Sequence, residues 1–477
     1  MLTTIAPDAL RRIHLLGVAG TGMGSFAGLL KDAGYDVTGS DQNVYPPMSD
    51  MLARWGVETL SPYAPENLDR ARPDLVITGN VIRRVNPEAT AVRERGLPQM
   101  SFPAALGALF LDSRHSIVVA GTHGKTTTSA LMSHVLVDAG TDPSFLVGGV
   151  TLNAESNFRL GHGPYFVVEG DEYDTAYFDK GPKFLHYRAR TALLTSVEFD
   201  HADIYRDLAH YEAAFVRFAE TIPADGTLVV CSTYPNAERI AREHARGKVI
   251  TYAREGDADF RARNIRFAPE GAHFEIERRD GSRTAVLLPM SGMHNVENAV
   301  GVFAVATTLG LAPEQVAAAF ESFKGVRRRQ EVKAEVRDVL VIDDFAHHPT
   351  AVQETIDGIR QRYAGRRLIA AFEPRSNTSR RNIHQAAYVD ALEDADAVFL
   401  KIPEPHDQVP MDQQLDVGKI VTDLSERGVA AHGTKDVDEL VRLVAGDAKP
   451  GDVILVMSNG AFGNFVPKVI EALDRAG

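Results

Sequence analysis

An apolar run that ends in glycines and a lysine is the segment whose chemistry is easiest to recognise. Residues 118–128 read VVAGTHGKTTT. Gly121 and Gly124 allow the backbone to wrap closely, so that N–H groups can point at phosphate oxygens. The helix expected to follow adds its positive amino end. Lys125 supplies a positive charge for terminal phosphates, and the segment therefore predicts a loop that binds a nucleoside triphosphate.

The threonines after this lysine extend the chemistry to a metal ion. A hydroxyl at Thr126 or Thr127 can ligate Mg²⁺ beside the phosphates. The spacing departs from the common G-x-x-x-x-G-K-[ST], because Val119 stands where the first glycine would fall. A glycine turn with a surface lysine is the simpler alternative. The strand pattern before the loop and the helix pattern after it favour phosphate binding.

Carboxylates and a histidine follow two more apolar runs. In a parallel sheet such strand ends lie at the same edge as the phosphate loop, and Mg²⁺ prefers oxygen ligands. We therefore expect Glu169 and His201 to bind the metal, whereas Asp174 and Asp203 are expected to cap helices. The two groups, in YFVVEGDEYD (165–174) and TALLTSVEFDHADIY (191–205), are Glu169, Asp171, Glu172, Asp174 and Glu198, Asp200, His201, Asp203.

A second glycine cluster occurs near the start of the chain, in IHLLGVAGTGMGSFAGLL (13–30). Its spacing is G-x-x-G-x-G-x-G, and Asp41 follows at the end of the next apolar run, where a carboxylate could bind a ribose hydroxyl. The alternative is that these glycines only permit tight packing. An NAD-dependent dehydrogenase would use such a loop, but hydride transfer needs no triphosphate site. A sugar nucleotide here and ATP at the second loop account for both.

Three further polar groups could contact ligands. MHNVENA (293–299) places Asn295 and Asn298 on one face of a helix start, where amides can hold a base or ribose or cap the helix. DDFAHHPTA (343–351) contains two adjacent histidines, which cannot share one face of a strand or helix, so a dinuclear metal site is not expected. We expect instead a polar loop that reaches into an interdomain cleft. Arg375, in EPRSNT, could clamp a carboxylate.

Composition limits the class of protein. The 477 residues suggest two to four domains, and 44% hydrophobic with 24% charged residues is typical of a globular chain. A net charge of −13 argues against general nucleic-acid binding. The single cysteine, Cys231, lies in an apolar run and is expected to be a buried thiol in a reducing compartment. No secretory signal or membrane span is expected, which favours a cytoplasmic location.

Apolar runs alternate with amphipathic stretches, the pattern of parallel strands and crossover helices in an α/β protein. Residues 247–290 instead favour antiparallel hairpins with a turn at 280–283. The runs form three series, which predict three domains at 1–113, 114–326 and 327–477. The expected strands are 13–18, 35–39, 74–79, 116–120, 165–169, 191–197, 227–231, 339–343, 367–372, 397–402 and 452–457.

Taken together, these motifs resemble the Mur ligase family, the ATP-dependent amide-forming enzymes of bacterial cell-wall synthesis. The resemblance covers nearly the whole chain, in the order GTHGKTT, EGDEYD, EFDHAD, MHNVENA, RRQE and DDFAHHPT. It implies a Rossmann-like first domain for a UDP-muramyl nucleotide, a central P-loop ATPase-like α/β domain for ATP and Mg²⁺, and a Rossmann-like third domain for the incoming amine.

The resemblance also implies residue roles. The ATP phosphates would lie over Gly121, Thr122, His123, Gly124, Lys125, Thr126 and Thr127. Glu169 and His201 match magnesium-binding positions, with Thr126. Asn295, Asn298, Arg329, Asp344 and His348 match positions that contact the nucleotide, and Lys125, Glu169 and His201 would be the catalytic set. The UDP sugar would lie over Gly20, Thr21, Gly22, Met23, Gly24 and Asp41, and Arg375 would anchor the peptide.

Within the family, SDQNVYPPMS, EFDHADI, EPRSNT and MSNGAFG are most similar to the branch that joins L-alanyl-γ-D-glutamyl-meso-diaminopimelate to UDP-N-acetylmuramate in peptidoglycan recycling. The branch that adds L-alanine shares GTHGKTTT and DD-x-x-HHPT and stays open as the alternative. One departure from other members is YEAAF (211–215), where Phe215 replaces a lysine that is carbamylated elsewhere in the family. No modified lysine is therefore expected.

Overall fold

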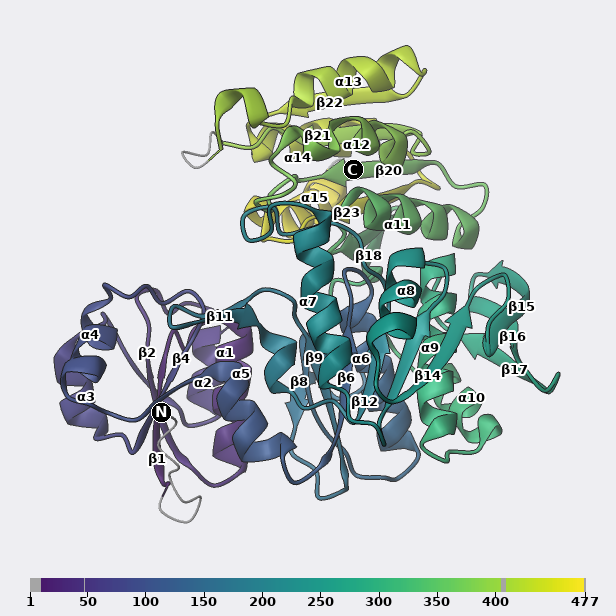
Figure 1. Cartoon of the computed structure of the whole chain (residues 1–477). Coiled ribbons are helices and arrows are strands. Elements are labelled where there is room, and N and C mark those ends of the chain that lie inside the picture. Colours follow the sequence, from purple (N-terminus) through teal and green to yellow (C-terminus); the bar gives the residue numbers. More distant parts are fainter. Residues whose placement is uncertain (1–9, 47, 405–408, 476–477) are drawn as a thin grey trace. The chain divides into compact units, whose positions relative to one another are not determined.

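The computed structural model describes residues 10–46, 48–404 and 409–475 (Figure 1). The chain folds into two compact units. Unit 1 comprises Met1–Glu198, Ala209–Tyr252 and Gly301–Ala319, and unit 2 comprises Phe199–Leu208, Ala253–Val300 and Phe320–Gly477. No described helix has the length and apolar character needed to cross a membrane.

Unit 1 begins with a fully parallel sheet in the order β3-β2-β1-β4-β5. Helices lie on both of its sides in Figure 1. Its strands are β1 (Arg12–Leu16), β2 (Asp36–Ser40), β3 (Glu58–Leu60), β4 (Leu75–Thr78) and β5 (Gln99–Ser101). Its helices are α1 (Thr21–Asp32), α2 (Met48–Arg54), α3 (Pro65–Ala71), α4 (Pro87–Glu94) and α5 (Phe102–Leu106).

The second sheet of unit 1 has the order β14-β13-β12-β6-β9-β7-β8, parallel except for the edge strand β8. A short hairpin, β10–β11, follows β9. The strands are β6 (His115–Ala120), β7 (Ser144–Thr151), β8 (Ser156–Arg159), β9 (Tyr165–Gly170), β10 (Asp174–Ala176), β11 (Asp179–Pro182), β12 (Thr191–Leu194), β13 (Thr227–Cys231) and β14 (Lys248–Ala253). The helices are α6 (Lys125–Asp138), α7 (Leu208–Thr221), α8 (Pro235–His244) and α10 (Pro313–Glu321).

Unit 2 contains an antiparallel set, β15-β16-β17, and a sheet in the order β18-β19-β23-β20-β21-β22. Only β18 is antiparallel in that sheet, and apolar clusters fill both of its faces. The strands are β15 (Phe260–Ala268), β16 (Gly271–Arg278), β17 (Arg283–Leu288), β18 (Glu331–Val336), β19 (Val339–Asp344), β20 (Leu368–Phe372), β21 (Ala397–Lys401), β22 (Ala430–Thr434) and β23 (Val453–Met457). The helices are α11 (Pro349–Arg362), α12 (Gln385–Leu392), α13 (Val417–Glu426), α14 (Val437–Asp447), α15 (Phe465–Arg475) and the first half of α9 (Met293–Thr308), whose residues from Gly301 onward belong to unit 1.

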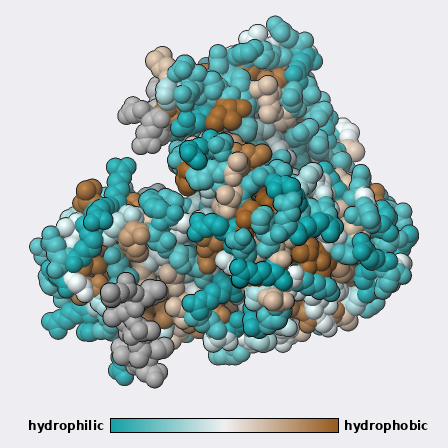
Figure 2. All heavy atoms as spheres, in the orientation of Figure 1, coloured by the Kyte–Doolittle hydropathy of each residue, from teal (hydrophilic) through white to brown (hydrophobic). Residues whose placement is uncertain are grey.

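All eleven expected strands form, with ends within a few residues of those predicted. The hairpin expectation is confirmed for β15–β17, but the first part of 247–290 is wrong, because β14 pairs in parallel with β13. Cys231 is fully buried, as expected. Hydrophilic side chains cover most of the face drawn in Figure 2, where apolar residues form only scattered patches.

Candidate active site

The loop between β6 and α6 requires glycine at two positions. Gly121 has a φ of +137°, and a Cβ there would collide with the Thr195 hydroxyl oxygen. Gly124 has a φ of +77° and is the N-cap of α6. Both conformations are costly for residues that carry a side chain. The sequence therefore turns sharply at the carboxyl end of β6 and begins a 14-residue helix at Lys125.

The end of β12 clamps this loop from the side. Thr122 N–H donates to Ser196 O at 3.1 Å, and His123 N–H donates to Ser196 Oγ at 2.9 Å. The Thr195 hydroxyl donates to His123 O at 2.5 Å. Two of the loop N–H groups are thus used within the protein. The N–H groups at the start of α6, which have no partner inside a helix, are the donors that remain for an anion.

Lys125 lies against a buried carboxylate. Its Nζ is 2.9 Å from Glu172 Oε2 and 3.3 Å from Oε1, and it also donates to Gly121 O at 2.6 Å and Thr122 O at 3.2 Å. The Glu172 side chain is 1% exposed. Burial opposes the charged ammonium, but Glu172, Asp171 and Glu169 outweigh it and raise the pKa of Lys125. The lysine is therefore held positive at the base of the loop.

Glu169 and Thr126 meet beside this lysine. β9 pairs with β6 so that Glu169 lies opposite Val119, and the Thr126 hydroxyl donates to Glu169 Oε1 at 2.8 Å. Glu169 Oε2 accepts from Gly148 N–H at 2.7 Å. Burial, followed by repulsion from Asp171, raises the pKa of Glu169. A half-buried carboxylate and a hydroxyl form the oxygen-rich donor pair that suits Mg²⁺.

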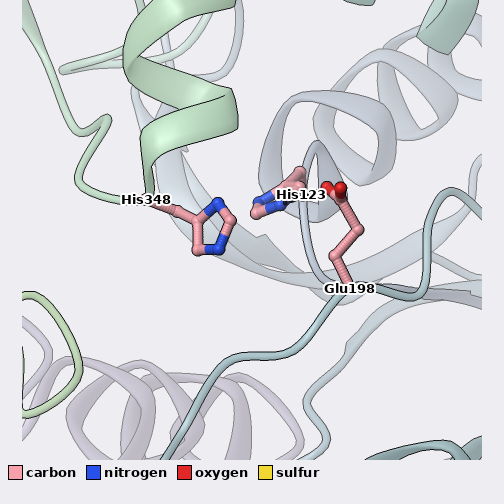
Figure 3. A group of neighbouring side chains, drawn as sticks. All are labelled: His123, Glu198 and His348. Atoms are coloured by element: carbon pink, nitrogen blue, oxygen red, sulfur yellow. Dashed lines mark ion pairs between the residues drawn. The ribbon is translucent and has the colours of Figure 1, made fainter. Parts of the chain in front are cut away.

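His123 and Glu198 extend the polar edge of the same sheet. Their Nε2 and Oε2 atoms lie 3.0 Å apart, and Figure 3 shows the side chains directed toward each other. The Thr122 hydroxyl donates to Glu198 O at 2.9 Å and lies 3.0 Å from Tyr211 Oη. No motif indicated Tyr211 as a member of this group, because it comes from α7, 89 positions along the chain.

The capping expectation for two aspartates is wrong. Asp174 lies in strand β10 and pairs with Lys180 at 2.6 Å, so the chain extends after it where a helix was expected. Asp203 accepts from the Asn377 side chain at 3.0 Å. A strand-end carboxylate caps only when its own residue starts a helix, and neither does. Asp171, by contrast, bonds Lys183 at 3.0 Å, and that ammonium lies 4.0 Å from the Tyr173 ring.

The first glycine loop joins β1 to α1, which begins at Thr21 after N-cap Gly20. Gly20, Thr21 and Gly22 are exposed, while Met23 and Gly24 are buried. Asp41 accepts from Ala19 N–H at 2.9 Å and from Gln42 N–H at 2.7 Å. The aspartate thus orders the backbone of this loop, and its role toward a ribose stays a prediction.

In unit 2, the two amides of the MHNVENA segment lie together on the first turns of α9, as expected. Asn298 Nδ2 donates to Asn295 Oδ1 at 3.4 Å, and Asn295 Nδ2 donates to Ser291 O at 2.8 Å. Both side chains are buried. Ser291 O also accepts from the Gln330 side chain at 3.2 Å, which ties this helix start to the RRQE segment.

Asp344 ends β19 and holds the adjacent chain by its backbone. It accepts from Gln330 N–H and from Ala346 N–H, both at 2.7 Å. Burial raises the pKa of Asp344, and Arg329 counteracts this rise. The Arg329 guanidinium lies 4.9 Å from the Phe345 ring. His348 is the N-cap of α11 and accepts from Thr350 N–H at 3.3 Å.

Arg328 has a structural role that the sequence did not reveal. It donates to Ser458 O at 2.6 Å and Gly460 O at 2.7 Å, and it pairs with Asp343 at 3.3 Å. Arg375 lies against Gly460, where a Cβ would collide with its guanidinium group. Its exposed position leaves the peptide-anchor role a prediction.

His201, in unit 2, follows a buried aspartate and adopts a left-handed backbone with a φ of +52°. Its N–H donates to Asp200 Oδ1 at 2.7 Å. Burial would raise the pKa of Asp200, but His201, His347 and His348 lower it well below the usual range. A positive φ at a residue other than glycine is uncommon and is retained only where the surroundings enforce it. The metal-ligand role of His201 stays a prediction.

Known proteins match this architecture along almost the whole chain. The Mur ligase family catalytic domain matches residues 12–114, the Mur ligase middle domain 119–306, and the Mur ligase glutamate ligase domain 328–460. The chain belongs to the Mur ligase family, whose members are ATP-dependent ligases.

Individual relatives and a solved structure are similar to this chain along almost its whole length. UDP-N-acetylmuramate–L-alanyl-γ-D-glutamyl-meso-2,6-diaminoheptandioate ligase of Escherichia coli is 39% identical, over 97% of this chain and 98% of that protein. UDP-N-acetylmuramate–L-alanine ligase of Delftia acidovorans is 34% identical, over 98% and 97%. The crystal structure of a murein peptide ligase from Psychrobacter arcticus superposes with a TM-score of 0.71 at 35% identity, covering 97% and 98%.

Proposed function

We propose that this chain joins L-alanyl-γ-D-glutamyl-meso-diaminopimelate to UDP-N-acetylmuramate with consumption of ATP. The reaction class is supported by the group at the end of β6, where Lys125, Glu172, Glu169 and Thr126 meet beside a helix amino end. The observation that carries the choice of peptide is the near-full-length similarity to the Escherichia coli tripeptide ligase.

The chemistry follows from the poor reactivity of a carboxylate toward an amine. Transfer of the γ-phosphoryl group of ATP to the lactyl carboxylate releases ADP and creates an acyl phosphate, whose leaving group is phosphate. The peptide amine then attacks the carbonyl carbon and loses a proton, and the tetrahedral intermediate expels phosphate to leave the amide. Lys125 would stabilise the negative charge that develops during phosphoryl transfer, the step at which electrostatic stabilisation contributes most.

Thr126 and Glu169 would hold a magnesium ion. Both residues offer oxygen ligands, and Thr126 Oγ1 lies 2.8 Å from Glu169 Oε1. Burial raises the pKa of Glu169, and a nearby cation would stabilise its charged form. When bound, Mg²⁺ would neutralise charge on the phosphates. The protein would contribute the orientation of the two donors, since Glu169 Oε2 is fixed by Gly148 N–H.

L-Alanine is the second candidate for the incoming amine, because the Delftia acidovorans relative is nearly as similar over the same span. The purified chain should release ADP only when ATP, UDP-N-acetylmuramate and the amine are all present. Comparing the tripeptide with L-alanine in this assay, with product mass measured, distinguishes the candidates. Equal or faster ligation of L-alanine would contradict the tripeptide proposal, and nicotinamide reduction without ATP would contradict the ligase class.

A further inference from the structure

The Tyr211 hydroxyl, which comes from α7, contacts both the carboxylate that pairs with Lys125 and the Thr122 side chain of the phosphate loop. Tyr211 Oη donates to Glu172 Oε1 at 3.3 Å and lies 3.0 Å from the hydroxyl oxygen of Thr122. Tyr211 is fully buried. Glu172 in turn contacts Lys125 through both carboxylate oxygens, so one continuous set of polar contacts runs from α7 to the ammonium.

We infer that Glu172 and Tyr211 are positioning residues, which hold the Lys125 ammonium where the transferred phosphoryl group will develop charge. This inference rests on the ATP-dependent ligation proposed above. Neither residue is expected to touch the substrates; both act through the lysine. Nothing in the family resemblance assigned them a role beyond membership of the EGDEYD and YEAAF segments.

The donor count of Lys125 supports this role. An ammonium group has three N–H donors, and Lys125 has four oxygen contacts, with Gly121 O, Thr122 O and both oxygens of Glu172. All donors are engaged before any ligand arrives, so the nitrogen is confined. A phosphate oxygen must therefore replace one of these contacts. The longest, to Glu172 Oε1 and Thr122 O, are the ones expected to yield.

Glu172 needs both partners because it is almost completely buried. A carboxylate in such surroundings is stable only when a cation and hydrogen-bond donors compensate the lost hydration. Lys125 supplies the charge and Tyr211 supplies a neutral donor. The Tyr211 hydroxyl also fixes the orientation of the Glu172 carboxylate relative to Thr122. The Thr122 hydroxyl donates to Glu198 O and accepts from Glu198 N–H, both at 2.9 Å.

The turn of α7 that follows Tyr211 is apolar. Phe215 is fully buried, with its ring centre 5.2 Å from that of Tyr211 and 5.5 Å from that of Phe184. Phe215 occupies the position at which the family resemblance implies a carbamylated lysine in other members. α7 therefore contributes to the phosphate loop through a tyrosine hydroxyl, while its next turn packs as apolar core.

Replacement Glu172→Gln in the full-length chain tests the inference. The amide keeps the size but loses the charge that confines the ammonium. We expect kcat to fall at least about tenfold, whereas the Kd for ADP, measured by calorimetry, changes less than about threefold, because helix N–H groups still bind the phosphates. Tyr211→Phe should also lower kcat, but by a smaller factor, because the ion pair between Lys125 and Glu172 is retained.

Two control variants separate positioning from general loss of structure. Glu277→Gln removes a carboxylate that pairs with Arg261, Arg263 and Arg283 on the hairpins, and Tyr35→Phe removes a hydroxyl near the end of α1. Both should keep wild-type kcat and Kd. The inference is wrong if folded Glu172→Gln retains wild-type kcat, or if kcat and ADP binding weaken together. Failure of the wild-type chain to ligate any amine would instead contradict the proposed function.

Discussion

The two glycine loops of unit 1 share a plan but differ in what surrounds them. Each joins a parallel strand to a helix, β1 to α1 and β6 to α6. The first begins its helix at an extended Gly20 and has a carboxylate, Asp41, bonded to its backbone. The second begins at a left-handed Gly124 and places Lys125 and Thr126 in the first helical turn.

Neighbouring strands explain the difference. β1 lies beside β2, whose end leads to the carboxylate of Asp41, so the first loop presents backbone N–H groups and the Thr21 hydroxyl beside a negative charge. β6 lies between β9 and β12, whose ends supply Glu169 and the Thr195–Ser196 clamp. A glycine turn alone thus indicates anion binding, and the adjacent strands decide whether it can also support phosphoryl transfer.

Replacing the lysine should remove the feature that most distinguishes the second loop. In Lys125→Ala we expect kcat/KM to fall by a factor of about 100 to 1,000, as when one donor to a developing anion is lost. The same change leaves Glu172 buried without its cation, so the free energy of unfolding should fall by about 3 kcal/mol. Steady-state kinetics and urea denaturation measure the two effects.

The double variant Lys125→Ala with Glu172→Gln separates those effects. Without the buried charge, the free energy of unfolding should recover most of the loss, whereas kcat/KM should stay low. Recovery of activity in the double variant would show that the single change acted through misfolding. Full activity of the single variant would remove the reason for treating the two loops as functionally different.

Glu169→Gln tests the metal side of the second loop. The amide can still accept from Thr126 or from Gly148 N–H, but it lacks the negative charge that a divalent cation requires. We expect the Mg²⁺ concentration for half-maximal activity to rise on the order of 10- to 100-fold at saturating ATP. A magnesium titration measures this, with the KM for UDP-N-acetylmuramate as the control that should not change. An unaltered magnesium requirement would exclude Glu169 as a ligand.

Local sequence predicted the second loop well because its determinants are contiguous. Strand, glycines, lysine and helix occur within residues 115–138, and the structure places each as expected. The strands with long apolar runs were found for the same reason. β3 and β5 were missed because they have three residues each, and β7 was missed because two glycines interrupt its apolar pattern.

The rest of the site depends on pairing that no local pattern encodes. Glu172 faces Lys125 only because β9 pairs with β6, and Tyr211 reaches Thr122 from a helix distant in sequence. The capping rule failed at Asp174 because a strand followed where a helix was assumed. Glu169 and His201 were predicted as site residues from their positions after apolar runs and from the family motifs, whereas the long-range contacts of the site became visible only in the fold.

The first loop should respond to a change that leaves the second unaffected. Asp41 uses one carboxylate oxygen to accept from Ala19 N–H and the other to accept from Gln42 N–H. In Asp41→Asn, one of these oxygens is replaced by an amide NH₂ group, which donates, and the other loses its negative charge. A hydrogen bond to a charged group contributes about 1.5 to 3 kcal/mol, so the KM for UDP-N-acetylmuramate should rise roughly tenfold or more. The KM for ATP should not change. Equal increases in both constants would mean that the two loops are not independent.

Asp74→Asn is the matched control in the same sheet and gives the smallest expected effect. Asp74 accepts from the side chain and backbone of Arg12 at the start of β1, which lowers the pKa of Asp74 from its usual 3.8 to about 2. A carboxylate with a lowered folded-state pKa stabilises the protein above about pH 4, and the contribution disappears as pH falls toward 2. The variant should therefore be less stable than wild type by under about 1 kcal/mol at pH 7, since the pair is partly exposed.

Urea unfolding at several pH values measures that difference, which should shrink between about pH 4 and pH 2, the interval given by the two pKa values of Asp74. Both KM values should match wild type, because Asp74 anchors the amino end of β1 and the first loop leaves its carboxyl end. A raised KM for UDP-N-acetylmuramate in this variant would indicate that the loop depends on how the whole strand is held. Asp41→Asn would then report strand anchoring rather than a contact made by the loop itself.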